Sequence, residues 1–207
     1  MVSMAIRWRT LWERLDLRGS ADAAYAEIER RYSEPHRRYH TLDHVARCLS
    51  EVDEIWRSLD NPPAVRMALW LHDVVYDPLS KGNEERSAFF AGDMLVRAGA
   101  SDGLRAKVAA MIMSTTHTLP PWDNDSAYVL DIDLAILAAP PDEFERYRED
   151  VRFEYSAVPQ EEFDRGTVAF FSGLLSRPSI YHTHHFRGEY EERALWNITR
   201  MLRGLET

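Results

Sequence analysis

The sequence predicts an all-α protein, a single domain built as a multi-helix bundle. Apolar residues recur every three or four positions along most of the chain, which is the spacing that buries one face of a helix. No run alternates apolar and polar residues for long enough to predict a β-strand. The 207 residues contain no internal repeat, low-complexity tract or linker, so we expect one domain over residues 1–207.

Five helices are expected in the first part of the chain. Trp12 and Leu15 fall on one side of the first helix, and Ile28 and Tyr32 fall on one side of the second. The third carries a stripe of apolar side chains and stops before two prolines, which are tolerated in the first turn of the fourth. A loop at 77–82 precedes the fifth helix. The expected helices cover residues 4–16, 21–33, 41–59, 62–76 and 83–98.

Five more helices are expected after residue 100. One of them begins with Asp142 ahead of Glu143 and Glu145, so a capping side chain is followed by an acidic first turn that interacts favourably with the helix dipole. The expected helices cover residues 102–116, 124–138, 142–155, 160–176 and 187–204.

Composition limits the classes of function that the chain can have. The formal net charge of −9 argues against an extended nucleic-acid or anionic-membrane surface. A single cysteine, Cys48, rules out an internal disulfide and fits a reducing cytoplasm. The first residues are too charged for a secretory signal, and no apolar stretch is long enough to cross a bilayer. We expect a soluble cytoplasmic protein, in which the two tryptophans of the amphipathic first helix allow a homodimer contact.

The strongest sign of chemistry is the doublet His72-Asp73, which closes an apolar helical run. Two adjacent polar side chains at the inner end of a buried helix are costly unless something compensates them. A divalent cation would do so, because imidazole and carboxylate both bind it. A bare His-Asp pair often occurs by chance, and the pair gains weight from His44 upstream and Asp133 downstream.

Helix packing could bring these residues together. His40 and His44 are four residues apart, so both project from one helix face. Three helices around one core could join His44 and the doublet to Asp131 or Asp133. Two imidazoles with two carboxylates suit Mn, Fe, Co, Ni, Zn or Mg. So few protein ligands leave positions open for water and substrate.

The ligand pattern resembles the HD-domain superfamily, in which one His, a His-Asp pair and a distant Asp lie on helices. Here His44 precedes His72 by 28 residues, and Asp133 follows Asp73 by 60. The runs RYHTLDHV, LHDVVYD, NEERSA, STTH and LDIDLAIL are similar to one branch of predicted metal-dependent phosphohydrolases, and they cover about residues 30–140. The resemblance implies an HD-type bundle with those four ligands. It favours Asp133 over Asp131, which would instead orient a ligand imidazole.

The activity implied by the resemblance is hydrolysis of a small-molecule phosphoester, with a nucleotide among the candidates, by a phosphatase or phosphodiesterase. The metal would lower the pKa of a bound water that attacks phosphorus, and Asp73 would hold that water as well as the metal. Arg38 and His40 would bind substrate, because a planar guanidinium donates two hydrogen bonds to phosphate. The candidates for protonating the leaving oxygen are Glu84, Asp77 and His117.

Each of these candidates has a plainer interpretation. Glu84 could only stabilise a helix N-terminus, and Asp77 could only start a turn. His117 could be a second-metal ligand, a phosphate contact or a loop residue. The histidines at 182–185 fit no pattern that the resemblance carries, and we expect them in a loop with a structural role or exposed.

Two other classes of function stay open. A di-iron HD oxygenase would need two further histidines between the doublet and the last aspartate, and His117 is the only one there. A non-catalytic module that binds a nucleotide or a metal and regulates a partner would need the same four ligands without turnover.

Overall fold

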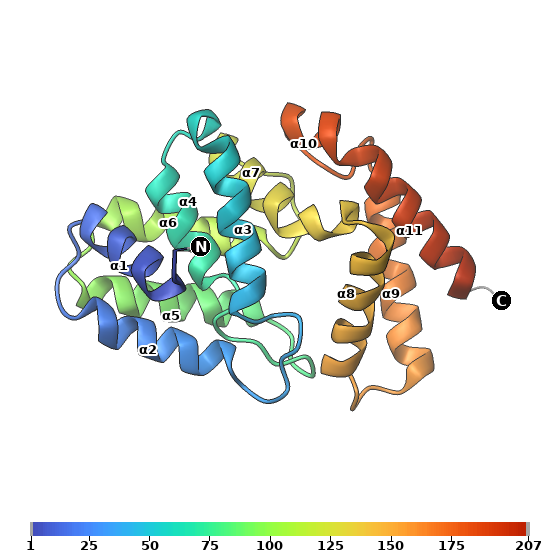
Figure 1. Ribbon diagram of the computed structural model, residues 1–207, viewed down its shortest axis with the longest axis horizontal. Helices are drawn as coiled ribbons and strands as arrows, with labels where there is room; N and C mark the ends of the chain where they lie inside the picture. The colour runs from blue at the N-terminus through green and yellow to red at the C-terminus, as the bar shows by residue number, and fades with distance from the viewer. Residues whose placement is uncertain (1, 206–207) are drawn as a thin grey trace.

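Helices account for the whole regular structure of residues 2–205, the part of the chain that the computed structural model describes. No strand occurs among these residues, so the predicted all-α class is confirmed. Figure 1 shows the helices before residue 134 gathered on one side, with α8, α9 and α11 side by side on the other. The helices of the first group are α1 Met4–Arg14, α2 Ala21–Tyr32, α3 Leu42–Ile55, η1 Trp56–Ser58, α4 Pro62–Leu71, α5 Asn83–Arg97, α6 Asp102–Ser114 and α7 Asn124–Asp133.

The remaining elements follow α7 without a long connection. The 3₁₀ helix η2 continues directly from α7, and α11 packs along it, which joins the two groups of helices. The elements of the second group are η2 Leu134–Ala138, α8 Pro141–Glu154, α9 Gln160–Leu175, α10 His184–Glu189 and α11 Glu191–Leu205.

Side-chain caps explain why several helices begin where they do. Ser3, Ser20, Ser101 and Thr183 each accept a hydrogen bond from a backbone N–H three residues later, which satisfies one of the free donors of a helix N-terminus. At the start of α7, Asp123 and Ser126 cap each other reciprocally.

Helix α4 lies at the centre of the first group. It packs against α1, α3, α5, α6 and α7, and its last five residues are fully buried. Trp70 meets the rings of Trp8 and Tyr25 edge-on, with ring centroids 5.3 and 6.2 Å apart. These last five residues of α4 are apolar on every side, and such a segment must be surrounded by other helices. The end of α4 is therefore held firmly inside the protein.

The helix boundaries differ from the sequence expectation by more than two residues at four places. The helix expected over 41–59 ends at Ile55 and is followed by the 3₁₀ helix η1. The helix expected over 62–76 ends at Leu71, because the carbonyls of Asp73 and Val74 accept hydrogen bonds from the Arg37 guanidinium, at 2.7 and 3.2 Å. The helix expected over 124–138 tightens into η2. The single helix expected over 187–204 is replaced by two helices, α10 and α11. Helix α10 starts at His184, inside the region expected to be a loop.

No helix in residues 2–205 is both long and apolar enough to cross a membrane.

Neighbouring arginines give a test of how the turn after α4 is held. The Arg37 side chain is fully buried and donates to the carbonyls of three residues, whereas that of Arg38 is 55% exposed. Arg37→Leu leaves buried acceptors unpaired and should lower the free energy of unfolding by about 3 kcal/mol. Arg38→Leu should cost about 0.5 kcal/mol, because an exposed ion pair contributes little. Urea denaturation measures both, and equal losses would contradict this account of the turn.

Candidate metal centre

Three helices each bring part of one cluster of potential metal ligands. His44 lies in the first turn of α3, His72 and Asp73 directly follow α4, and Asp133 is the last residue of α7. These three helices pack against one another in pairs. One ligand atom from each of the four residues lies within 4.8 Å of the others. This buried group could hold a metal ion.

The separations of the ligand atoms match a shared cation. The Nε2 atoms of His44 and His72 are 3.0 Å apart, and they lie 3.2 and 3.3 Å from Oδ1 of Asp133. Nε2 of His72 is 3.1 Å from Oδ2 of Asp73. Two atoms that are each about 2.1 Å from one cation lie about 3.0 Å apart at a right angle and about 3.4 Å apart at the tetrahedral angle. These four distances fall in this range, and the distance from Nε2 of His44 to Oδ2 of Asp73 is longer, at 3.7 Å.

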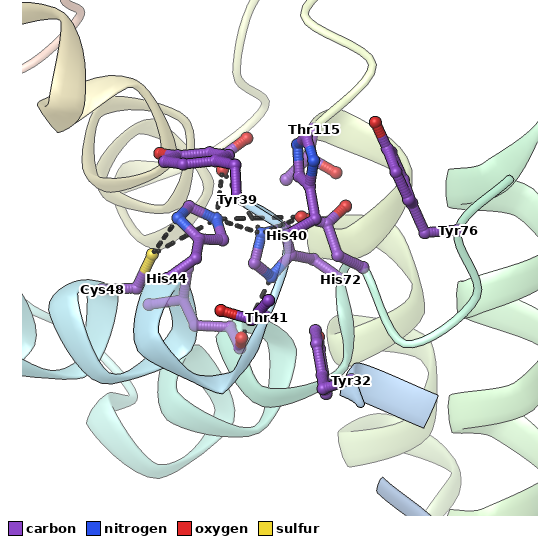
Figure 2. Close-up of polar contacts among 12 residues, drawn as sticks. Tyr32, Tyr39, His40, Thr41, His44, Cys48, His72, Tyr76 and Thr115 are labelled. Atoms are coloured by element: carbon purple, nitrogen blue, oxygen red, sulfur yellow. Dashed lines mark hydrogen bonds and ion pairs between the residues drawn. The ribbon is translucent and has the colours of Figure 1, made fainter. Parts of the chain in front are cut away.

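The tautomer of His72 also suits a metal ligand. Its Nδ1–H donates to the carbonyl of Leu69 at 3.0 Å, so the lone pair of the neutral ring is on Nε2, which faces the cluster. Figure 2 shows contacts running from the ring of His44 to its neighbours in the cluster, with Cys48 on the opposite side of that ring. The lone pairs of two imidazoles and two carboxylates would repel one another unless a proton or a cation lies among them. The donor set therefore fits a divalent cation.

The electrostatics of the cluster keep both carboxylates ionised. Burial alone would raise the pKa of Asp73 and of Asp133, but the adjacent His72 outweighs it and holds both pKa values below their usual range. Burial alone would lower the pKa of His72, and the same two carboxylates raise it well above its usual value. Burial, with the neighbouring His72, keeps the pKa of His44 low. Two negative charges thus face the cluster at neutral pH.

Of the two candidate aspartates, Asp133 joins the cluster and Asp131 does not. The buried Asp131 carboxylate accepts the backbone N–H groups of His182 and Thr183, both at 2.7 Å. Burial raises the pKa of this carboxyl to about 6. Asp131 therefore fastens α7 to the start of α10.

His117 touches the centre from outside the ligand group. Its Nε2–H donates to Oδ2 of Asp133 at 3.0 Å, while Oδ1 of the same carboxylate faces the two ligand histidines. The residue has a left-handed backbone with φ 54°, which is rare for a non-glycine residue, and its buried Nδ1 has no hydrogen-bond partner. His117 thus contacts a ligand carboxylate, and its role in proton transfer stays a prediction.

His40 lies beside the centre and is held by Glu154, a residue of α8. Its Nδ1 donates to Oε2 of Glu154 at 2.6 Å, and its ring stacks on Tyr76 with centroids 4.2 Å apart. Burial opposes a charged ring, but Glu154 and Asp73 outweigh it and raise the pKa of His40. The nitrogen left for another partner is Nε2, so His40 is positioned to donate a second hydrogen bond.

Glu154 itself is a buried carboxylate with five donors. Oε1 accepts the backbone N–H groups of residues 38, 39 and 40 at 2.7, 2.8 and 2.9 Å. Oε2 accepts from His40 and from the hydroxyl of Tyr76, the latter at 3.0 Å. Burial would raise the pKa of this carboxyl, but His40 and the backbone donors lower it to about 2. One side chain therefore fixes the segment that leads into α3.

The other predicted site residues lie further from the ligands. The Arg38 guanidinium pairs with Asp150 at 2.7 Å and lies over the ring of Phe153, so only its backbone N–H is bound to the Glu154 framework. Oδ1 of Asp77 accepts from the N–H of Leu79 at 3.0 Å, which is the turn interpretation. Glu84 is half-buried in the first turn of α5. Their catalytic or substrate-binding roles stay predictions.

Arg37, Glu154 and Cys48 are parts of the site that sequence reasoning missed. Cys48 follows His44 by one helical turn, and its Sγ lies within 3.9 Å of both ring nitrogens, so the spacing on α3 was a usable signal. Glu154 had no comparable signal, because its partners lie 78 to 116 positions away. Arg37 differs from Arg38 only in burial.

Comparison of the chain with protein-family models, with curated proteins and with solved structures finds no match. The case for a function accordingly comes from the side chains of the centre.

The pKa of Glu154 predicts how acid destabilises the protein. Its pKa is about 2 in the folded state and 4.5 when unperturbed, a difference equivalent to about 3 kcal/mol. Because the folded-state value is the lower one, this stabilisation is complete above about pH 5 and is lost as the pH falls toward 2. We expect the stability difference between wild type and Glu154→Gln to shrink over that interval in urea denaturation. A difference that does not change with pH would contradict the ionised Glu154.

Metal binding can be measured without assuming an activity. Isothermal titration of metal-free protein with Mn²⁺ should give one site per chain. Loss of a group outside the ligand set commonly weakens metal binding by about 10–100-fold, so Asp73→Asn should weaken it by at least about 100-fold. Asp43→Asn is the matched control, because Asp43 is exposed and adjacent to His44. Equal affinities in the two variants would rule out Asp73 as a ligand.

Proposed function

We propose that the protein is an HD-type metal-dependent phosphohydrolase that acts on a small phosphoester. The observation that carries the proposal is the group of His44, His72, Asp73 and Asp133 around one position, in the order His, His-Asp, Asp along the chain. When bound, a divalent cation supplies positive charge for phosphoryl oxygens and acidifies water. The mixed nitrogen and oxygen donors suit Mn, Fe, Co, Ni, Zn or Mg.

The charge of the ligand set supports a role for further cationic groups. The two carboxylates of Asp73 and Asp133 balance the charge of a divalent cation, so the ligands and the ion together carry little net charge. A phosphoester dianion therefore needs other donors. His40 supplies one, because the bond from Nδ1 to Glu154 fixes the ring and leaves Nε2 to donate to a phosphoryl or leaving-group oxygen.

The framework around His40 supports this role. Glu154 is buried and already accepts three backbone N–H groups, so it cannot swing away without leaving those donors unpaired. The ring of Tyr76 covers one face of the imidazole. A donor whose orientation is fixed before the substrate arrives is the arrangement that stabilises developing charge most effectively. Asp77, which is used in a turn, is less suited to the same task.

An oxygenase of the di-iron type receives less support. Such an enzyme would need a second set of ligands, and residues 2–205 contain one group of at least three clustered ligand side chains. His117 is the one additional histidine that contacts this group through a carboxylate. A non-catalytic binding module would have the same ligands as a phosphohydrolase, and it would differ from the enzyme only in lacking turnover.

A panel of phosphomonoesters and phosphodiesters tests the proposal. We expect the Mn²⁺-loaded protein to release phosphate or alcohol from at least one member. His40→Gln should lower kcat by about 100-fold, the usual contribution of a positioned proton donor, and should keep one bound Mn²⁺. Colorimetric phosphate release and Mn²⁺ titration provide the two measurements.

Two outcomes would count against this assignment. A metal-loaded wild type that hydrolyses no member of the panel would favour the non-catalytic module. Full activity in His40→Gln would remove His40 from the reaction while leaving the metal centre in place. The control is again Asp43→Asn, which changes an exposed carboxylate in the first turn of α3 that is not part of the cluster.

A further inference from the structure

A large apolar cavity lies beside the metal centre. It has a volume of about 850 Å³, is partly open to solvent and is bordered by α8, α9, the C-terminal part of α11 and the loop after α4. Aromatic side chains form much of its wall, namely Tyr147, Tyr155, Phe163, Phe170 and Phe171. Cavities of about 300–1,000 Å³ are typical sites for small molecules. None of the four metal ligands lines it.

Two aromatic rings connect the cavity wall to the metal centre. Tyr147 packs edge-on against Tyr39 with centroids 4.7 Å apart, and Tyr39 packs against the ligand His44 at 5.0 Å. Burial and the Asp133 carboxylate together raise the pKa of Tyr147, so its hydroxyl is within electrostatic range of a metal ligand. A pair of contacting rings, Tyr147 and Tyr39, thus links the cavity wall to the ligand His44.

The loop that follows the doublet forms another part of the wall. Pro78 and Leu79 line the cavity five and six positions after Asp73. Tyr155 also lines it, and burial followed by the charges of Glu154, Glu84 and Asp73 raises the pKa of its hydroxyl. The loop that follows the ligand Asp73 therefore forms part of the cavity wall.

Several polar groups of the wall bond within the protein, whereas the carboxylates of Glu149 and Glu162 are exposed to solvent. Arg152 donates to the carbonyls of Tyr155 and Val158 at 2.6 and 3.0 Å, and Arg148 pairs with Glu145 at 2.7 Å. Among residues 2–205, no buried side-chain nitrogen or oxygen that lines this cavity lacks a partner. Against the aromatic part of this wall, a nucleobase would lose hydrogen bonds to water without replacement, whereas an apolar group would lose none.

We propose that this cavity binds the apolar part of the substrate, which is the phosphomonoester of a large apolar alcohol. The inference rests on the proposed phosphohydrolase function. Water adds its oxygen to phosphorus, the bond from phosphorus to the alcohol oxygen breaks, and a proton passes to that oxygen. The products are inorganic phosphate and the apolar alcohol, which leaves from the cavity.

Two glycines of α9 allow the cavity to be filled selectively. Gly166 lines the cavity, and a Cβ added there would meet nothing within 4 Å. Gly173 on the same helix is exposed, as Gly166 is, has equally open surroundings and does not line the cavity. Leucine at either position improves helix propensity. Gly166→Leu therefore reduces the cavity, and Gly173→Leu is its matched control.

The first measurement needs no activity. The neutral fluorophore N-phenyl-1-naphthylamine should bind the metal-free full chain and be displaced by 1-decanol. We expect Gly166→Leu to weaken this binding at least about tenfold, because a side chain occupies the apolar space, and Gly173→Leu to change it less than about twofold. Equal binding in wild type and Gly166→Leu would overturn the proposal.

The second measurement links the cavity to turnover. With Mn²⁺-loaded wild type, KM should fall from ethyl to hexyl to decyl phosphate, and Gly166→Leu should remove most of this trend. A KM that does not depend on chain length, or a preference for nucleoside monophosphates over decyl phosphate, would overturn the inference and leave the phosphohydrolase proposal standing. Fluorophore binding that depends on Gly166, without hydrolysis of any phosphoester, would support an apolar site and overturn the proposed function.

Discussion

The structure depends on the need to bury α4 on every side. Its last five residues are apolar and fully enclosed, so five other helices pack around it. Wherever such a helix ends, its free carbonyls and the polar residues that follow it are inside the protein as well. The buried Arg37 binds the carbonyls of Asp73 and Val74, and the side chains of His72 and Asp73 meet ligands from α3 and α7. The metal centre is thus a consequence of how α4 is enclosed.

Charge balance also explains the arrangement of Glu154 and His40 beside the metal centre. A cluster of two carboxylates inside a protein needs cationic partners, and imidazoles within the cluster supply part of this need. Glu154 repeats the same principle a short distance away, where a buried carboxylate is balanced by His40 and by three backbone N–H groups. The two arrangements meet at the start of α3, because His44 lies in its first turn and His40 lies in the segment just before it. A change at one carboxylate is therefore expected to alter the orientation of side chains near the other.

Helical spacing predicted the fold class and left the last ligand open between Asp131 and Asp133, and the resemblance to the HD pattern selected the four residues that the structure clusters. His44, the doublet and Asp133 each fall on a helix end or first turn, and such positions can be inferred from the sequence pattern. The sequence pattern could not show which of the adjacent Arg37 and Arg38 is buried, because that depends on the fold. It also missed Glu154 and the early end of α4. Both depend on contacts between distant segments, which local periodicity does not contain.

Glu154 has a consequence for the modularity of this domain. All four clustered ligands and His40 lie between residues 40 and 133, and motif similarity alone would mark out a compact unit of about residues 30–140. Yet the carboxylate that orients His40 comes from α8, beyond that boundary. A fragment cut at residue 140 would keep every ligand but lose five hydrogen bonds that organise the entrance to α3. The smallest autonomous unit is therefore larger than the motif, and transplanting the centre to another scaffold would require α8 to accompany it.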